Sequence, residues 1–76
     1  SDQARSMALA ELARDFACSR LKPGGAFLVK VFQGAGYEEF FKSLRARFDK
    51  IVVRKPEASR GESAELYILA RGLKAP

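Results

Sequence analysis

The sequence is most restrictive in what it lacks. Its 76 residues contain no histidine, no tryptophan and a single cysteine, Cys18. One cysteine cannot form a disulfide within the chain, and without histidine a zinc site has almost no ligands to use. No apolar run approaches the roughly 18 residues of a transmembrane helix, and no signal-peptide pattern is present. We therefore expect no metal site, no membrane contact and a cytoplasmic location.

Acidic residues are also in short supply relative to basic ones. Fourteen Lys and Arg residues face nine Asp and Glu residues, a net charge of +5. Such an excess favours polyanionic partners such as nucleic acid, although many small domains are basic without binding one. The 47% hydrophobic and 30% charged residues indicate a soluble globular domain with one modest core. Because the chain begins at Ser1 and Met7 lies inside a helical pattern, we expect a piece of a longer protein.

Apolar periodicity and turn residues divide the chain into five predicted elements. Spacings of three and four predict a helix from residue 2 to about residue 21, ended by Pro23 and two glycines. A β-rich run over 26–32 is apolar on both faces, which favours a central strand covered by helices on both sides. After a glycine-rich loop over 33–36 come a second helix, a strand over 51–54, a polar loop over 57–64 and a last strand over 66–70.

Both predicted helices are amphipathic. We expect the aromatic face of the second helix to be core rather than a surface for stacking RNA bases. The apolar face of the first helix consists of Leu9, Leu12, Ala13, Phe16, Ala17 and Leu21, and that of the second of Tyr37, Phe40, Phe41, Leu44 and Phe48.

The order α-β-α-β-β predicts an α/β fold. A helical crossover favours a parallel arrangement of the first two strands, and a loop connection favours antiparallel pairing of the last two. If the last strand inserts between the other two, the sheet has two parallel strands with an antiparallel last strand between them, and Lys30 and Glu65 are cross-strand neighbours.

Lys30 is the residue that most needs an explanation. It is a charge inside an apolar strand, where burial is costly unless the charge is paired or needed. It also lies near the carboxyl end of that strand, where ligands gather in open α/β sheets. Lys30 is therefore either a functional residue or a charge that discourages edge-to-edge aggregation. Glu65 is either its partner or a solvated residue at a strand start.

Several motifs occur together over nearly the whole chain: residues 2–12, Leu-Lys-Pro-Gly-Gly at 21–25, Val-Lys-Val-Phe-Gln-Gly at 29–34, Arg-Lys-Pro-Glu-Ala-Ser-Arg at 54–60 and Ser-Ala-Glu-Leu-Tyr-Ile at 63–68. Together they resemble the FtsJ/RrmJ family of S-adenosylmethionine-dependent ribosomal RNA 2′-O-ribose methyltransferases. The first glycine motif is shared by most Rossmann-like methyltransferases, whereas Lys-Val-Phe-Gln-Gly followed by Arg-Lys-Pro and Glu-Leu-Tyr is much more specific.

The resemblance covers only the C-terminal part of the family's domain. It implies that residues 1–76 form a single partial domain with the last three strands of a Rossmann-like sheet. The N-terminal cofactor-binding part, with its glycine-rich turn and acidic ribose ligand, has no counterpart in this sequence. The full-length protein would methylate a uridine 2′-hydroxyl of 23S large-subunit ribosomal RNA, free or in the ribosomal subunit. The chain alone would bind no S-adenosylmethionine and would be inactive.

The resemblance also implies roles for individual residues. Of the family's Lys-Asp-Lys-Glu catalytic set, the second lysine falls on Lys30 and the glutamate on Glu65. Lys30 would accept the proton of the ribose 2′-hydroxyl, and Glu65 would position Lys30 or the ribose. Arg54, Lys55 and Arg60, on the same rim, would bind RNA phosphates. They would otherwise be a solvated basic loop.

Two other functions stay open, a small basic RNA-binding module without catalysis and a purely structural half-domain. A partial sheet also leaves the edge of the Ala26–Phe32 strand without a neighbour. We therefore expect the chain to self-associate or swap through this edge.

Overall fold

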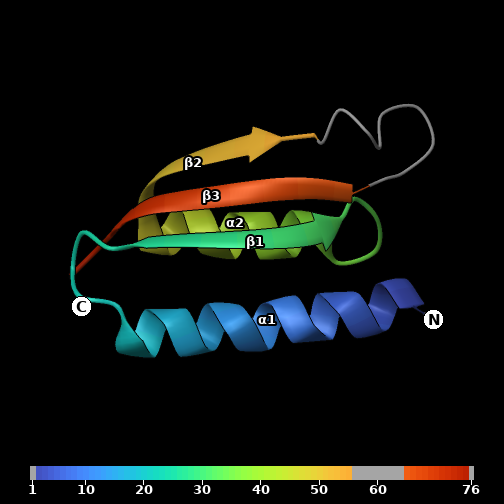
Figure 1. The fold of residues 1–76 in the computed structure, drawn as a ribbon, viewed down its shortest axis with the longest axis horizontal. Coiled ribbons are helices and arrows are strands. Elements are labelled where there is room, and N and C mark those ends of the chain that lie inside the picture. The colour runs from blue at the N-terminus through green and yellow to red at the C-terminus, as the bar shows by residue number, and fades with distance from the viewer. Residues whose placement is uncertain (1, 56–64, 76) are drawn as a thin grey trace.

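The chain folds in the predicted order, helix, strand, helix and two strands (Figure 1). The computed structural model describes residues 2–55 and 65–75, and side chains from residue 4. The predicted polar loop over 57–64 lies outside these ranges. The elements are α1 (Asp2–Arg20), β1 (Ala26–Phe32), α2 (Tyr37–Arg47), β2 (Phe48–Arg54) and β3 (Glu65–Leu73).

The turn between α1 and β1 ends the helix and joins it to the sheet. Gly24 has a φ of 89°, a left-handed conformation that favours glycine, and its N–H donates to the Leu73 carbonyl at 2.8 Å. The Gly25 carbonyl accepts from the N–H groups of Gly72 and Leu73, both at 3.1 Å. A side chain at position 25 would meet the Lys22 carbonyl oxygen at 3.0 Å. The two glycines therefore allow the chain to leave α1 and begin β1 directly beside the end of β3.

The sheet has the order β1-β3-β2, so the prediction of a last strand inserted between the other two is confirmed. Both ladders are antiparallel. β1 and β2 run in the same direction only because each is antiparallel to β3, and the described residues form no parallel ladder.

Two strands are longer than their sequence patterns predict. β2 begins at Phe48 instead of residue 51, and β3 continues to Leu73 instead of ending at residue 70. The pairing of Phe48 with Leu73 accounts for both extensions, because each strand lengthens to complete the other's hydrogen bonds. Gly72 lies inside this extension with a φ of 75°, and a Cβ there would lie 3.1 Å from that of Asp49.

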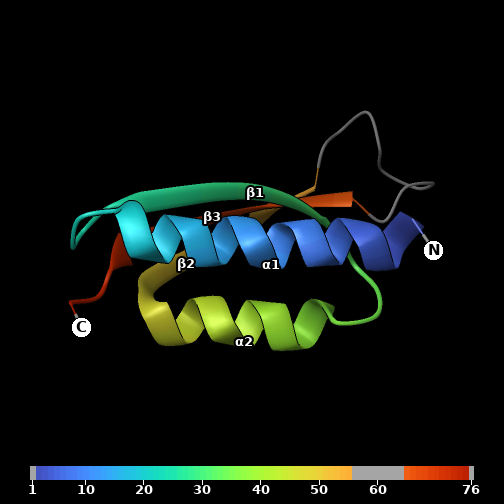
Figure 2. The same ribbon diagram turned by 90° about the horizontal axis from the view of Figure 1, so that it is seen from below.

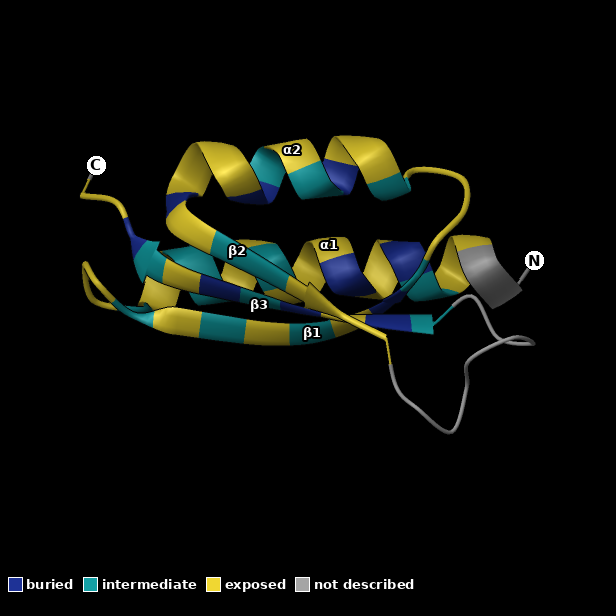
Figure 3. Cartoon of the chain, turned by 90° about the horizontal axis from the view of Figure 1, so that it is seen from above, coloured by how far each residue is buried: buried dark blue, intermediate teal, exposed yellow. Residues whose placement is uncertain are grey.

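The hydrophobic core lies on one face of the sheet only. The side chains of Val31, Ile68 and Ala70 point toward it and are at most 1% exposed. Figures 2 and 3 show α1 and α2 side by side on the same side of the sheet. The prediction of helices on both sides of β1 is therefore wrong. β1 is an edge strand whose other face is open, and Leu28 on that face is 63% exposed.

The predicted apolar face is buried in α2 but largely exposed in α1. In α2, Phe40 and Leu44 are buried, as the aromatic pattern predicts. The placement of Phe48 on this helix is wrong, because Phe48 is buried as the first residue of β2. In α1 the predicted face is wrong, because its large residues Leu9, Leu12 and Phe16 are more than 60% exposed, while Met7 and Ala10 are buried instead. The helix carries two apolar stripes, and packing against β1 and α2 covers only the one that the periodicity did not favour.

The aromatic start of α2 is partly buried as well. Tyr37 stacks on Phe41 with ring centroids 6.0 Å apart. Burial raises the pKa of the Tyr37 hydroxyl above its usual value of 10.0. The phenol therefore stays neutral at physiological pH and serves packing.

Arg14 joins the two helices. Its guanidinium donates to the Ser43 hydroxyl at 2.9 Å and lies 5.5 Å from the centre of the Phe40 ring. Its side chain is only 18% exposed, although it also pairs with Asp15 at 3.0 Å. Arg14 thus fills the seam between the helices with its stem and satisfies its charge at the rim.

We predict that Arg14→Ala lowers the free energy of unfolding by about 1–2 kcal/mol, the sum of a lost hydrogen bond and a lost cation–π contact. Urea unfolding followed by circular dichroism measures this change. Arg5→Ala on the same helix, where the residue is exposed, is the matched control. Equal effects of the two substitutions would show that Arg14 does not fasten α1 to α2.

Candidate functional site

The open face of the sheet carries a row of three polar or charged residues, one from each strand, which we call the Lys30 row. In the register of the two ladders, Tyr67 of β3 lies opposite Lys30 of β1 on one side and Arg54 of β2 on the other. Residues paired across antiparallel strands point to the same face. Because Leu66 and Ile68 point into the core, Tyr67 and its two neighbours point away from it.

Lys30 and Glu65 meet as predicted. The Lys30 Nζ lies 3.4 Å from Glu65 Oε2. Glu65 is directly opposite Phe32, so the contact is diagonal along the ladder. The lysine side chain is 49% exposed and the glutamate side chain 25%. The contact directs the end of the Lys30 side chain toward β3.

The loop after β1 brings α2 close to this end of the sheet. Gly36 begins the helix with a φ of 85° and supplies no side-chain cap. A Cβ at that position would meet Met7 at 3.3 Å, so the loop packs against α1. Glu38 and Glu39 occupy the first turn of α2. Their charges disfavour an anion at this helix N-terminus, which the glycine-rich loop alone would otherwise invite.

The predicted RNA-contact residues are only partly placed by the structure. Arg54 ends β2 in the same row as Lys30, and Lys55 follows it; both are exposed. Arg60 lies outside the described residues. Two of the three predicted contacts therefore lie on the Lys30 side of the molecule, at the end of the sheet where β1 and β2 finish.

Tyr67 is the residue at this site that the sequence reasoning missed. It stands between two aliphatic residues that point into the core, Leu66 and Ile68. The alternation of a strand places it on the other face, where it is 40% exposed. That alternation was visible in the sequence. Its place between Lys30 and Arg54 depended on the register of both ladders.

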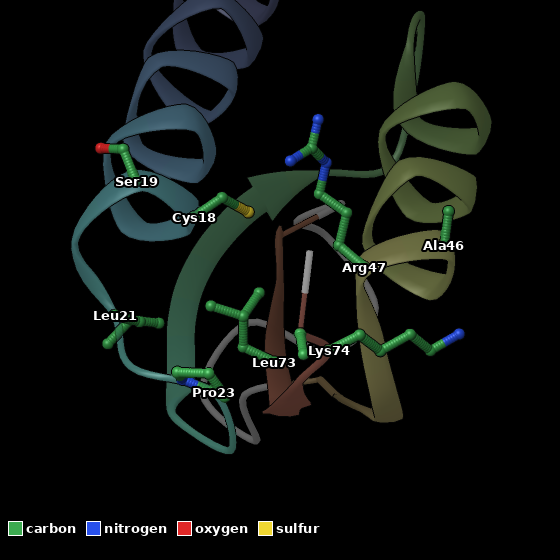
Figure 4. Close-up of a pocket in the computed structure, with 9 residues that line it drawn as sticks. Cys18, Ser19, Leu21, Pro23, Ala46, Arg47, Leu73 and Lys74 are labelled. Atoms are coloured by element: carbon green, nitrogen blue, oxygen red, sulfur yellow. The ribbon is translucent and has the colours of Figure 1, made fainter.

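A cavity of about 570 Å³ lies at the opposite end of the sheet (Figure 4). It opens between the ends of α1 and α2, over Leu21, Pro23 and Leu73. Figure 4 shows the Cys18 thiol and the Arg47 guanidinium in the space between the helices, with Lys74 extending away from α1. Two of the side chains that line it, Arg47 and Lys74, are cationic. Lys30 does not line this cavity.

Neither a metal-ligand cluster nor a membrane-spanning helix occurs among the described residues. Within residues 2–55 and 65–75, no three His, Cys, Asp or Glu side chains are grouped to hold a metal ion. Neither described helix is long and apolar enough to cross a membrane.

We predict that the Lys30–Glu65 pair contributes little to stability. In a double-mutant cycle with Lys30→Met and Glu65→Gln, the coupling energy should stay below about 1 kcal/mol, as for other half-exposed ion pairs. Chemical unfolding of the four proteins measures it. A coupling of several kcal/mol would mean that the pair holds the sheet together, and a purely structural role for Lys30 would then gain support.

Comparison of the sequence with known proteins identifies its family. The sequence model of the FtsJ-like methyltransferases matches residues 1–73. The ribosomal RNA large subunit methyltransferase E of Marinobacter nauticus is 54% identical over 97% of the chain and 36% of that protein. The proteins of the same name are 60% identical in Thiobacillus denitrificans, over 92% of the chain and 32% of that protein, and 59% in Neisseria meningitidis, over 93% and 34%. The chain thus spans about a third of the length of these relatives, and it belongs to the FtsJ-like methyltransferase family.

Proposed function

We propose that this chain is the C-terminal part of an S-adenosylmethionine-dependent methyltransferase that modifies a ribose 2′-hydroxyl of large-subunit ribosomal RNA. The relatives' names support the enzyme class and the substrate. The observation that carries the proposal is the contact of Lys30 with Glu65 at 3.4 Å on the open face of the sheet, at the end where β1 finishes. We assign Lys30 as proton acceptor and Glu65 as its positioning residue.

The chemistry explains why the pair is not sufficient. A ribose hydroxyl becomes a nucleophile when a base takes its proton, and a lysine can do so only as a neutral amine. This chain supplies Lys30 with a carboxylate beside it. The resemblance assigns the further lysine and aspartate of the catalytic set to residues that this sequence does not contain, so we propose that residues 1–76 are a partial domain without activity of their own.

The described residues do not fit the methyl donor. The cavity of about 570 Å³ lies at the end of the sheet opposite Lys30, and a sulfonium held there could not reach a ribose at Lys30. Two smaller cavities, one beside Asp49 and one beside Asp15, do not include Lys30 either. The glycine-rich loop after Lys30 precedes α2, whose first turn carries two glutamates. Their charges disfavour an anionic group at this helix N-terminus. We therefore assign S-adenosylmethionine binding to the remaining two-thirds of a protein of the relatives' length.

The basic residues at the end of the sheet where β1 and β2 finish would bind the RNA. Arg54 and Lys55 are exposed beside the Lys30 row, and the chain carries a net charge of +5. Contacts of this kind bind phosphates, orient the strand and weaken with salt, but they read little sequence. The alternative function, a basic RNA-binding module without catalysis, rests on the same residues and differs in needing no Lys30 chemistry.

We also propose that the isolated chain self-associates with a second copy. Among the described residues β1 pairs only with β3, which leaves its other edge with unpaired backbone groups. Leu28 on β1 and Leu9, Leu12 and Phe16 on α1 add uncovered apolar surface near that edge, and Lys30 is the only charge on β1. Two copies paired edge to edge would bury their backbone groups and bring the same apolar residues together symmetrically.

The proposed function is tested by restoring the missing part. The N-terminal two-thirds of the Marinobacter nauticus relative, joined to this chain, should transfer a labelled methyl group from S-adenosylmethionine to large-subunit ribosomal RNA. Lys30→Ala in this chimera should lower the rate at least about 100-fold, the usual contribution of a general base. Lys50→Ala, on the same face at the far end of β2, is the matched control and should leave the rate unchanged.

The 76-residue chain alone should transfer no methyl group in the same assay. Full activity of the Lys30→Ala chimera would exclude Lys30 as proton acceptor. Activity of the chain alone would refute the partial-domain assignment.

Self-association is tested by analytical ultracentrifugation of the chain over a range of concentrations. We expect a dimer at high concentration that Leu12→Glu weakens, because a charge on the α1 stripe would be buried between the copies. Glu11→Gln, an exposed neighbour outside the stripe, should not change it. A monomer at every concentration would rule out the proposed pairing.

A further inference from the structure

Tyr67 occupies the centre of the Lys30 row and has no role in the core. Its ring lies on the open face between Lys30 and Arg54, and it is 40% exposed. No described helix covers this face, since both helices pack on the other side. An aromatic ring between two cations on an uncovered face is available to stack on a ligand.

The surroundings of Tyr67 suit a nucleotide. With strands about 4.8 Å apart, Lys30 and Arg54 lie about 10 Å from each other with the ring between them. Toward the middle of the sheet the next row is apolar, formed by Leu28, Leu69 and Val52 in register. An aromatic surface flanked by positive charge is the arrangement with which flat sheets bind unpaired bases of single-stranded RNA.

We propose that Tyr67 stacks on the base of the nucleotide whose ribose lies at Lys30. This rests on the proposed function for the position of the ribose. Lys30 is the nearest neighbour of Tyr67 on β1, so a base on the ring brings its own ribose toward the ammonium or amine. Arg54, on the other side of the ring, binds an adjacent phosphate. Tyr67 is thus a positioning residue that holds the target nucleotide unpaired and oriented.

Stacking tolerates every base, because each has an aromatic face. Tyr67 would therefore select an unpaired nucleotide rather than a particular sequence. A duplex would present its phosphates to Arg54 but could not place a base on the ring. The site distinguishes single-stranded from double-stranded RNA by this means.

The test uses the 76-residue chain and a ten-nucleotide single-stranded RNA of uridines with one central 2-aminopurine. Stacking on Tyr67 should quench the 2-aminopurine fluorescence on binding. Tyr67→Phe keeps the ring and should keep the quenching. Tyr67→Leu should abolish the quenching and weaken binding about 5- to 150-fold, the range for one stacked base. Tyr37→Phe, on the core side, is the aromatic control and should behave as wild type.

Charge contacts are separated from stacking by salt dependence. Arg54→Gln should reduce the slope of log affinity against log salt by about 1 while keeping the quenching. Lys50→Gln and Arg71→Gln, paired with each other on the same face at the far end of the sheet, are the matched charge controls. Circular dichroism of every variant shows whether it is folded, so that a loss of binding is assigned to the ring and not to unfolding.

Two results would overturn the proposal: no quenching by the wild-type chain, or quenching that survives Tyr67→Leu in a folded protein. The proposed function fails separately. If the Lys30→Ala chimera still transfers methyl groups while Tyr67→Leu abolishes quenching, the assignment of Lys30 is wrong and the stacking role stands. If Lys30→Ala abolishes transfer and Tyr67→Leu leaves quenching intact, the stacking role is wrong and the assignment of Lys30 stands.

Discussion

The insertion of β3 between β1 and β2 is the constraint on which the rest of the structure depends. It makes both ladders antiparallel and sets the register that lines up Lys30, Tyr67 and Arg54 across the sheet. It brings Glu65 within 3.4 Å of Lys30 from a position 35 residues later in the chain. A shift of β3 by one residue would turn Tyr67 into the core and Ile68 out of it. Burial of Ile68 therefore also fixes the register of the Lys30 row.

The two faces of the sheet have different surroundings. One face packs against both helices and contains every buried side chain of the described core strands, including Val31, Ile68 and Ala70. The other face is open and carries the charged row beside an apolar one. Such an asymmetric arrangement leaves an edge, an apolar helix stripe and an aromatic ring uncovered. We propose a second protein surface as the partner of the edge and the stripe, and an RNA base as the partner of the ring.

The cavity and Lys30 lie at opposite ends of the sheet. The chain supplies a lysine with its carboxylate, and a rim of positive charge, at one end of the sheet. At the other end it has a cavity whose lining includes Arg47 and Lys74. Under the proposed function, proton transfer and RNA contact belong to the residues at the Lys30 end, and the methyl donor binds to other parts of the full-length protein. This division agrees with a chain that spans about a third of its relatives.

Much of this could be predicted from the sequence. Pro23 and the glycines end α1, a β-rich apolar run marks β1, and the motif around Lys30 together with the strand order predicted its contact with Glu65. The tertiary structure alone decided which stripe of α1 is buried, that both helices lie on one face, and that Tyr67 stands between Lys30 and Arg54. The reason is physical. Periodicity shows that an element has an apolar face, but whether that face is covered depends on a partner distant in the chain. For Leu12 and Leu28 the described chain provides none.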